Sequence, residues 1–204
     1  MAMTPETRDY RTFEMRALPP EGGDGQQQCR VEGYAAVFDQ ETVLYEYDGI
    51  QYKEVIDRNA FSGAEMRDVV MNFNHGGKPV ARTRNGTLTL AVDSKGLRIS
   101  ADLGGTEEGR RLYEEIRGGY LDQMSFAFTV NKAEYDRAKH LRRITGFKRI
   151  FDVAAVDIPA YDGTSIAARS WAAAEAEREH AEADKRRRLE IKLKMSGIME
   201  GETT

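Results

Sequence analysis

Short runs of β-branched and aromatic residues, separated by turn-forming residues, dominate the middle of this sequence. The runs cover residues 31–38, 43–47, 52–56, 69–75, 87–92, 97–101, 122–131 and 144–157. Alternation of apolar and polar residues within such runs is typical of half-buried strands. We therefore predict a mainly β (β-dominated α+β) fold, a closed or nearly closed β-barrel with a few surrounding helices, rather than a parallel α/β sheet.

One segment inside this β-rich body has the pattern of a helix. Thr106 can cap its first turn, and Gly118-Gly119 can end it. Leu112 and Ile116 lie one turn apart and would form its buried stripe. We expect this helix to pack on the sheet.

Composition changes towards both ends of the chain. Residues 1–28 end in a loop rich in Pro, Gly and Gln and are predicted to form a flexible N-terminal segment. Residues 29–170 form the predicted compact body. Residues 171–204 are rich in Ala, Glu and Arg and are predicted to be a charged tail, helical or disordered. The tail is either a solvated face or a docking helix.

Charge and hydropathy exclude several classes of protein. The chain has 30 Lys and Arg against 34 Asp and Glu, a net charge of −4, so general attraction to nucleic acid or anionic lipid is not expected. The basic cluster at 185–188 is flanked by acids and is interpreted as a solvated face. No apolar run is long enough for a membrane span, the first twenty residues lack the apolar stretch of a signal peptide, and a single Cys29 cannot form an internal disulfide. We expect a protein that is neither secreted nor membrane-spanning.

Three side chains in the body could together carry nucleophilic chemistry. His75 follows an apolar run and precedes Gly76-Gly77, which would leave its imidazole at a sheet edge. Ser125 lies between large apolar residues, and Asp152 stands in an apolar run where a carboxylate needs a partner. A serine hydroxyl needs a base, and a carboxylate can orient that base. Each residue also has a structural interpretation: a hydrogen-bonded histidine, a serine on a crowded surface and an edge-strand acid.

Other chemistries have less support in the sequence. There is no CxxC, HExxH, Walker loop or GxSxG pattern, and no GxGxxG follows a strand. His140 lies in a basic connection and His180 in the charged tail, so both are interpreted as surface residues. A metal hydrolase that uses His75 and His140 is an alternative that predicts sensitivity to chelators. No cofactor or metal is predicted.

Four segments in order resemble those of a known family. They read GYAAVF at 33–38, NFNH at 72–75, MSFAF at 124–128 and FDVAAVDIPA at 151–160. Together they resemble the tailed-phage prohead maturation serine proteases over about residues 30–170. The resemblance implies a fold similar to herpesvirus assemblin, a β-barrel serine protease ringed by helices. Two positions depart from the family pattern: Ala154 stands where Ser is frequent, and Asp157 is an unexpected acid.

The resemblance also implies roles for single residues. By position, Ser125 matches the nucleophile, His75 the general base and acid, and Asp152 the acidic position that orients the histidine, where Glu is more usual. Assemblin uses a second histidine as its third member, so His140 is the alternative to Asp152. For the oxyanion we predict backbone amides helped by Arg142 or Arg143.

The expected function is therefore a serine endopeptidase of phage capsid maturation that acts through an acyl-enzyme. Its implied substrates are the major capsid protein, its scaffolding segment and the protease itself. Its implied location is the inside of the immature capsid, the prohead, in the host cytoplasm. No membrane or specific nucleic-acid partner is predicted, and a homo-oligomer is left open. The rival interpretation is a non-catalytic capsid-assembly or scaffolding module on the same barrel.

Overall fold

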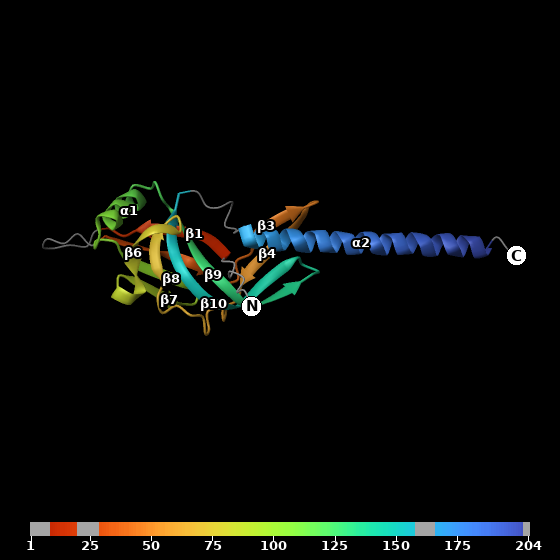
Figure 1. Cartoon of the computed structure of the whole chain (residues 1–204), viewed down its shortest axis with the longest axis horizontal. Coiled ribbons are helices and arrows are strands. Elements are labelled where there is room, and N and C mark those ends of the chain that lie inside the picture. The colour runs from red at the N-terminus through yellow and green to blue at the C-terminus, as the bar shows by residue number, and fades with distance from the viewer. Residues whose placement is uncertain (1–8, 20–28, 158–165, 202–204) are drawn as a thin grey trace, which may run out of the picture.

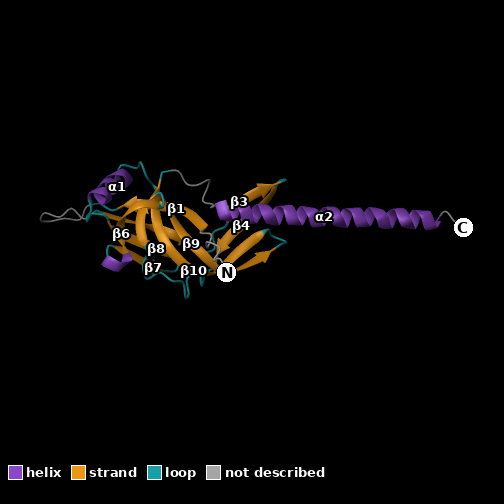
Figure 2. Ribbon diagram, viewed as in Figure 1, coloured by secondary structure: helices purple, strands orange, loops and turns teal. Residues whose placement is uncertain are grey.

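A computed structural model of the chain describes residues 9–19, 29–157 and 166–201. Within them, ten strands form one mixed sheet, and two α-helices and one short 3-10 helix accompany it. The strands are β1 (Asp9–Ala17), β2 (Arg30–Val37), β3 (Thr42–Tyr47), β4 (Ile50–Ile56), β5 (Val70–Phe73), β6 (Gly76–Arg82), β7 (Leu88–Val92), β8 (Gly96–Asp102), β9 (Gln123–Asp136) and β10 (Leu141–Val156). The helices are η1 (Thr83–Asn85), α1 (Glu107–Arg117) and α2 (Ile166–Gly201). The prediction of a mainly β fold is confirmed (Figure 2).

The long strand β10 is the branch point of the sheet. The hydrogen-bonded order is β3-β4-β10-β9-β1-β2-β8-β7, and the β5–β6 hairpin attaches separately to β10. The first residues of β10 pair in parallel with β4, and residues 152–155 pair in parallel with β5. In the described residues, no pairing joins β7 to β3, so the predicted closed barrel is not supported. Strand number can be inferred from alternation, whereas closure depends on register and on which strands pair.

The first described segment is part of the sheet. Asp9–Ala17 was predicted to belong to a flexible segment, but it forms β1 between β9 and β2, antiparallel to both. Phe13 and Met15 face the core, whereas Glu14 and Arg16 alternate with them. Thr12 is the single β-branched residue of this segment, which explains why the strand was missed. Residues 1–8 and 20–28 lie outside the described residues.

The main core fills one face of the curved sheet and is covered at one end by α1 (Figure 1). The rings of Phe126 and Phe128 lie 4.6 Å apart between their centroids. Leu112 and Ile116 of α1 belong to the same cluster. Thr106 accepts a hydrogen bond from the backbone N–H of Gly109 at 2.9 Å, so the predicted cap and buried stripe of this helix are confirmed.

Helix α2 projects away from the sheet along the long axis of the molecule (Figure 1). The base of the helix packs on the β3–β4 hairpin, where Ala172 and Ala176 contact a second cluster that contains Leu44 and Tyr52. The tail was predicted to be helical or disordered from residue 171; in the structure it is part of a helix that begins at Ile166. Neither helix of the described chain combines the length and the hydropathy that a membrane span requires.

Candidate active site

The β5–β6 hairpin positions His75. Phe73 pairs with Gly76, so Asn74 and His75 form a two-residue loop, and both have positive φ values, 48° and 55°. Positive φ is uncommon for residues other than glycine and is found more often at functional sites. The sequence predicted a turn at Gly76-Gly77, but both glycines belong to β6. The turn uses Asn and His instead, two residue types that tolerate the left-handed region.

His75 and Asp152 are in direct contact. Nδ1 of His75 lies 2.5 Å from Oδ1 of Asp152, a carboxylate that is 5% exposed. A buried carboxylate is strongly unfavourable without a donor, and the imidazole N–H supplies one. A carboxylate oxygen accepts hydrogen bonds, so this contact favours the imidazole tautomer in which Nδ1 is the donor.

Ser125 lies on the same face of the sheet as Asp152. Across the β9–β10 pairing, Ser125 is opposite Ala154, and Ala127 is opposite Asp152. Side chains alternate between faces along a strand, so these four residues share one face, and Met124 and Phe126 point into the core on the other. Ser125 and Asp152 are thus diagonal neighbours, a relationship that separates residues by about 7–8 Å.

The two residues that accompany Ser125 and Asp152 on this face are alanines. Ala127 and Ala154 have short side chains and are fully buried. The resemblance implied Ser at position 154, and the chain has a fully buried alanine there.

Asn72 is a polar residue on this face that sequence reasoning did not select. It pairs with Ala154, which places it in the same row as Ser125, and it is 7% exposed. Its Oδ1 is buried and has no hydrogen-bond partner in the described chain. Unsatisfied buried polar atoms are rare, and those that occur are frequent at functional sites. The only signal in the sequence was a polar residue in an apolar run, two residues before Asn74.

The family of caudovirus prohead serine proteases matches residues 13–179 of the chain. The chain belongs to this family. No curated protein and no solved structure matches it. The family resemblance drawn from sequence is thereby confirmed, and the chain is a member of a family of serine peptidases of phage capsid maturation. A fold like that of assemblin is not shown. The matched region extends beyond both ends of the predicted 29–170 body.

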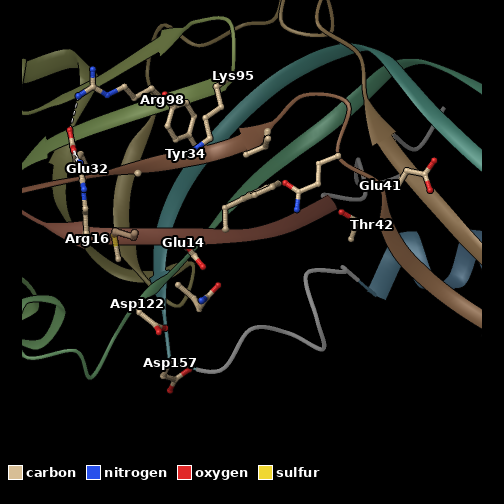
Figure 3. Close-up of a pocket in the computed structure, with 16 residues that line it drawn as sticks. Glu14, Arg16, Glu32, Tyr34, Glu41, Thr42, Lys95, Arg98, Asp122 and Asp157 are labelled. Atoms are coloured by element: carbon tan, nitrogen blue, oxygen red, sulfur yellow. Dashed lines mark hydrogen bonds and ion pairs between the residues drawn. The ribbon is translucent and has the colours of Figure 1, made fainter.

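This family member has a cleft of about 1100 Å³ that is lined in part by residues of β1 and β2 (Figure 3). Gln123 lines it and lies two residues from Ser125 on the same strand face. Glu14 lies opposite Gln123 across the β1–β9 pairing. The backbone N–H of Asp157 donates a 3.3 Å hydrogen bond to Asn74 Oδ1, which places Asp157 beside the turn that carries His75. The cleft therefore starts one row of residues from the serine.

Glu32 forms ion pairs with two arginines at the other side of this cleft. Its carboxylate lies 2.5 Å from Arg16 and 2.6 Å from Arg98. The hydrogen bonds from Arg16 and then from Arg98 hold the pKa of Glu32 below its ordinary value. Glu32 is therefore ionised at neutral pH, and the three side chains together carry one net positive charge.

Arg142 does not lie near the candidate triad. It forms a largely buried ion pair with Glu54 at 3.0 Å, and its guanidinium lies 4.9 Å from the centroid of the Trp171 ring. It stands near the beginning of β10, whereas Asp152 stands near the end; at about 3.3 Å per residue these positions are roughly 30 Å apart along the strand. The prediction that Arg142 supports the oxyanion is wrong.

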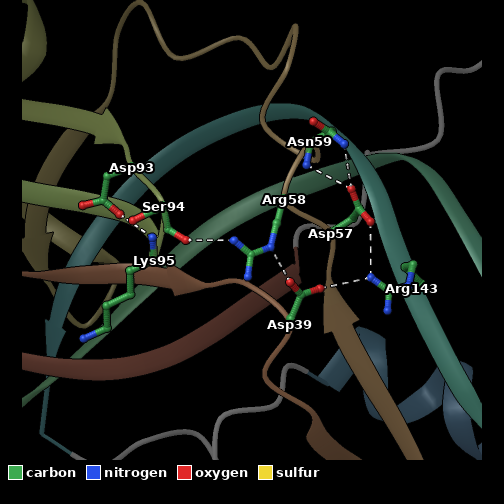
Figure 4. A network of polar contacts seen from close by, with 8 residues as sticks. All are labelled: Asp39, Asp57, Arg58, Asn59, Asp93, Ser94, Lys95 and Arg143. Atoms are coloured by element: carbon green, nitrogen blue, oxygen red, sulfur yellow. Dashed lines mark hydrogen bonds and ion pairs between the residues drawn. The ribbon is translucent and has the colours of Figure 1, made fainter.

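Arg143 is held in a separate network (Figure 4). It donates to Asp39 at 3.3 Å and to Asp57 at 3.2 Å, and Asp39 also accepts from Arg58 at 2.7 Å. The network ties the start of β10 to the loops after β2 and β4. The oxyanion prediction is wrong for Arg143 too, because Arg143 is next to Arg142 on β10 and is therefore about as far from Asp152.

His140 lies at the opposite end of β10 from Asp152. It occupies the β9–β10 turn with φ 49°, and its Nδ1 lies 2.9 Å from Glu179 of α2. His140 therefore cannot join His75 in a metal site, and within the described residues no three His, Cys, Asp or Glu side chains are grouped to hold a metal ion. His180 packs its ring against Tyr47, at 4.6 Å between centroids.

Proposed function

We propose that this chain is a serine endopeptidase that cleaves scaffold or capsid-protein extensions inside the phage prohead, and that it also cleaves itself. The observation that carries the proposal is the 2.5 Å contact between His75 and Asp152 on the sheet face that bears Ser125. Membership of the prohead serine protease family supports the same chemistry. The substrates in this proposal are the major capsid protein and its scaffolding segment.

The proposed reaction has two halves. Ser125 Oγ attacks the scissile carbonyl carbon while Nε2 of His75 takes the hydroxyl proton, and the resulting imidazolium is stabilised by Asp152. The tetrahedral intermediate collapses, the C–N bond breaks, and His75 returns the proton to the leaving amine. Water then attacks the acyl-enzyme with His75 again as base, which releases the acid product and restores Ser125.

Ser125 is only 3% exposed in this structure. A polypeptide must therefore displace the residues that cover the serine before its carbonyl can reach Oγ. This burial supports an enzyme that is inactive until the surface above the sheet opens. A small serine-reactive phosphonate should consequently label Ser125 faster than a bulky one.

Intact mass spectrometry tests the proposal directly. The purified chain should produce shorter species with time, alone or mixed with a capsid protein bearing its scaffolding extension, and the Ser125→Ala variant should not. Ser62→Ala, which alters an exposed serine outside the cleft, is the matched control and should behave as the unmodified chain. Identical masses for the unmodified and Ser125→Ala chains, together with no phosphonate label on Ser125, would favour the non-catalytic scaffolding interpretation.

A further inference from the structure

The cleft beside Ser125 is charged differently at its two sides. Figure 3 shows Glu14, Asp122 and Asp157 on one side of β1, and Lys95 and Arg98 on the other side. The three carboxylates come from different segments: β1, the residue before β9 and the residue after β10. The sheet therefore gathers three acids at the side of the cleft that borders the candidate triad.

Two of these carboxylates, Glu14 and Asp122, are not neutralised as the other charges of the cleft are. Glu32 is paired with two arginines, and Glu41 pairs with Lys53 at 3.0 Å. By contrast, neither Glu14 nor Asp122 forms an ion pair within the described part of the chain. The side of the cleft that borders the candidate triad thus has acidic side chains without basic partners in the described part of the chain.

The position of this charge relative to the nucleophile decides what it can bind. Glu14 stands in the row next to that of Ser125, and rows of residues that share a face are about 6–7 Å apart. An extended Lys or Arg side chain covers about the same length. A substrate whose scissile carbonyl sits at Ser125 can therefore place the side chain of an adjacent residue against Glu14.

We propose that this cleft holds the substrate segment next to the scissile bond, and that Glu14 and Asp122 select a Lys or Arg in that segment. The inference rests on the proposed function, since it takes Ser125 as the nucleophile. The substrate class is an extended polypeptide with a basic residue beside the cleaved bond. Because the cleft is open to solvent, its selectivity is electrostatic and falls as ionic strength rises.

Binding to the Ser125→Ala chain tests the selectivity without catalysis. Fluorescence anisotropy would compare the binding of three peptides that are identical except for Lys, Gln or Glu at one position. In capsid-derived peptides this position is the residue beside the cleavage site found by mass spectrometry. Where no cleavage is found, it is the centre of a neutral ten-residue peptide. We expect the Lys peptide to bind about tenfold more tightly than the Gln peptide at low salt, and the Glu peptide to bind most weakly. Adding Glu14→Gln and Asp122→Asn should reduce the Lys preference to less than about threefold.

Glu134→Gln is the matched control, because Glu134 is an exposed carboxylate on the outer part of β9, remote from the cleft. It should leave the preference unchanged. Equal binding of the three peptides, or a Lys preference that survives both cleft substitutions, would overturn the inference.

Cleavage of a peptide library by the unmodified chain separates the two proposals. Cleavage that depends on Ser125 but shows no enrichment of Lys or Arg next to the cut leaves the peptidase assignment standing and refutes the selectivity. Enrichment that disappears with Glu14→Gln and Asp122→Asn supports both. If the library stays uncleaved and Ser125 takes no phosphonate, the peptidase assignment fails, and the anisotropy result alone decides whether the cleft binds basic segments.

Discussion

Nδ1 of His75 lies 2.5 Å from Oδ1 of Asp152, although 77 residues separate the two along the chain. The parallel pairing of β5 with the end of β10 brings them together, and the left-handed turn at Asn74 and His75 aims the ring back at the sheet. A parallel pair needs a long connection between its strands. Most of the β-rich body forms that connection, so the contact exists only in the complete fold.

Replacing Asp152 by Asn should lower kcat/KM by at least about a hundredfold without unfolding the protein. An amide can present its N–H to Nδ1, which favours the wrong imidazole tautomer and removes the charge that stabilises the imidazolium. Steady-state cleavage of a capsid-derived peptide measures the effect, and circular dichroism checks the fold.

His140→Ala provides the comparison for Asp152→Asn. His140 contacts Glu179 on the helix rather than the triad, so the loss of activity should be less than about tenfold. A folded His140→Ala chain that loses more activity than Asp152→Asn would mean that the third member has been assigned to the wrong residue.

Replacing Asn72 by Ala should lower activity without lowering stability. Its buried Oδ1 has no hydrogen-bond partner in the described chain, so removing the amide relieves an unsatisfied group of the folded state. We expect the melting temperature to stay constant or rise, and kcat to fall about tenfold or more. Asn131→Ala, on the exposed part of β9, is the control and should change neither quantity. A lower melting temperature with full activity would show that Asn72 only supports the fold.

Local pattern predicted much of the fold and two features of the candidate site. Alternation in MSFAF predicted that Ser125 faces away from Phe126, and in the structure Phe126 but not Ser125 belongs to the core. The burial cost of a lone carboxylate singled out Asp152, and the structure places it against His75. The α1 cap and stripe were readable because helix signals lie within a few residues of one another.

Features that depend on distant pairing could not be predicted. Arg142 was considered for the oxyanion because it is basic, but its partner Glu54 is set by the β4–β10 register, which no local pattern encodes. The β1 strand was missed because Thr12 is its single β-branched residue. A closed barrel was predicted from the number of strands, but that number does not determine which strands pair, such as β5 with β10.

The base of α2 should be required for stability, and its far half should not. A chain that ends at Glu190 keeps Trp171, Ala172 and Ala176 and should melt within about 2 °C of the full chain. A chain that ends at Ser170 exposes the apolar surface of Leu44 and Tyr52 and should melt at least about 5 °C lower. Differential scanning calorimetry measures both. If the chain that ends at Ser170 melted at the same temperature as the full chain, the boundary at residue 171 that was predicted from the sequence would be supported.

The tyrosines that hold α2 should make this docking sensitive to alkaline pH. Burial, and then the hydrogen bond that Tyr52 donates to Glu179, raise the pKa of Tyr52 to about 12, and the same causes raise the pKa of Tyr135. An unfolded tyrosine titrates near about 10. Below that pH both states hold the proton and stability is complete.

As the pH rises from about 10 towards 12, the unfolded state loses the Tyr52 proton first, so the folded state becomes less stable across that window. The ring of Trp171, the single tryptophan, packs on Tyr135 with centroids 5.3 Å apart and so reports on docking. Its fluorescence should change between about pH 10 and 12 at a fixed temperature below melting. Tyr52→Phe combined with Tyr135→Phe should flatten the change, because phenylalanine has no proton to lose. Tyr120→Phe, which alters a highly exposed tyrosine, should leave the fluorescence change intact. An equally steep change of fluorescence with pH in the Tyr52 and Tyr135 double variant would show that these tyrosines do not control docking.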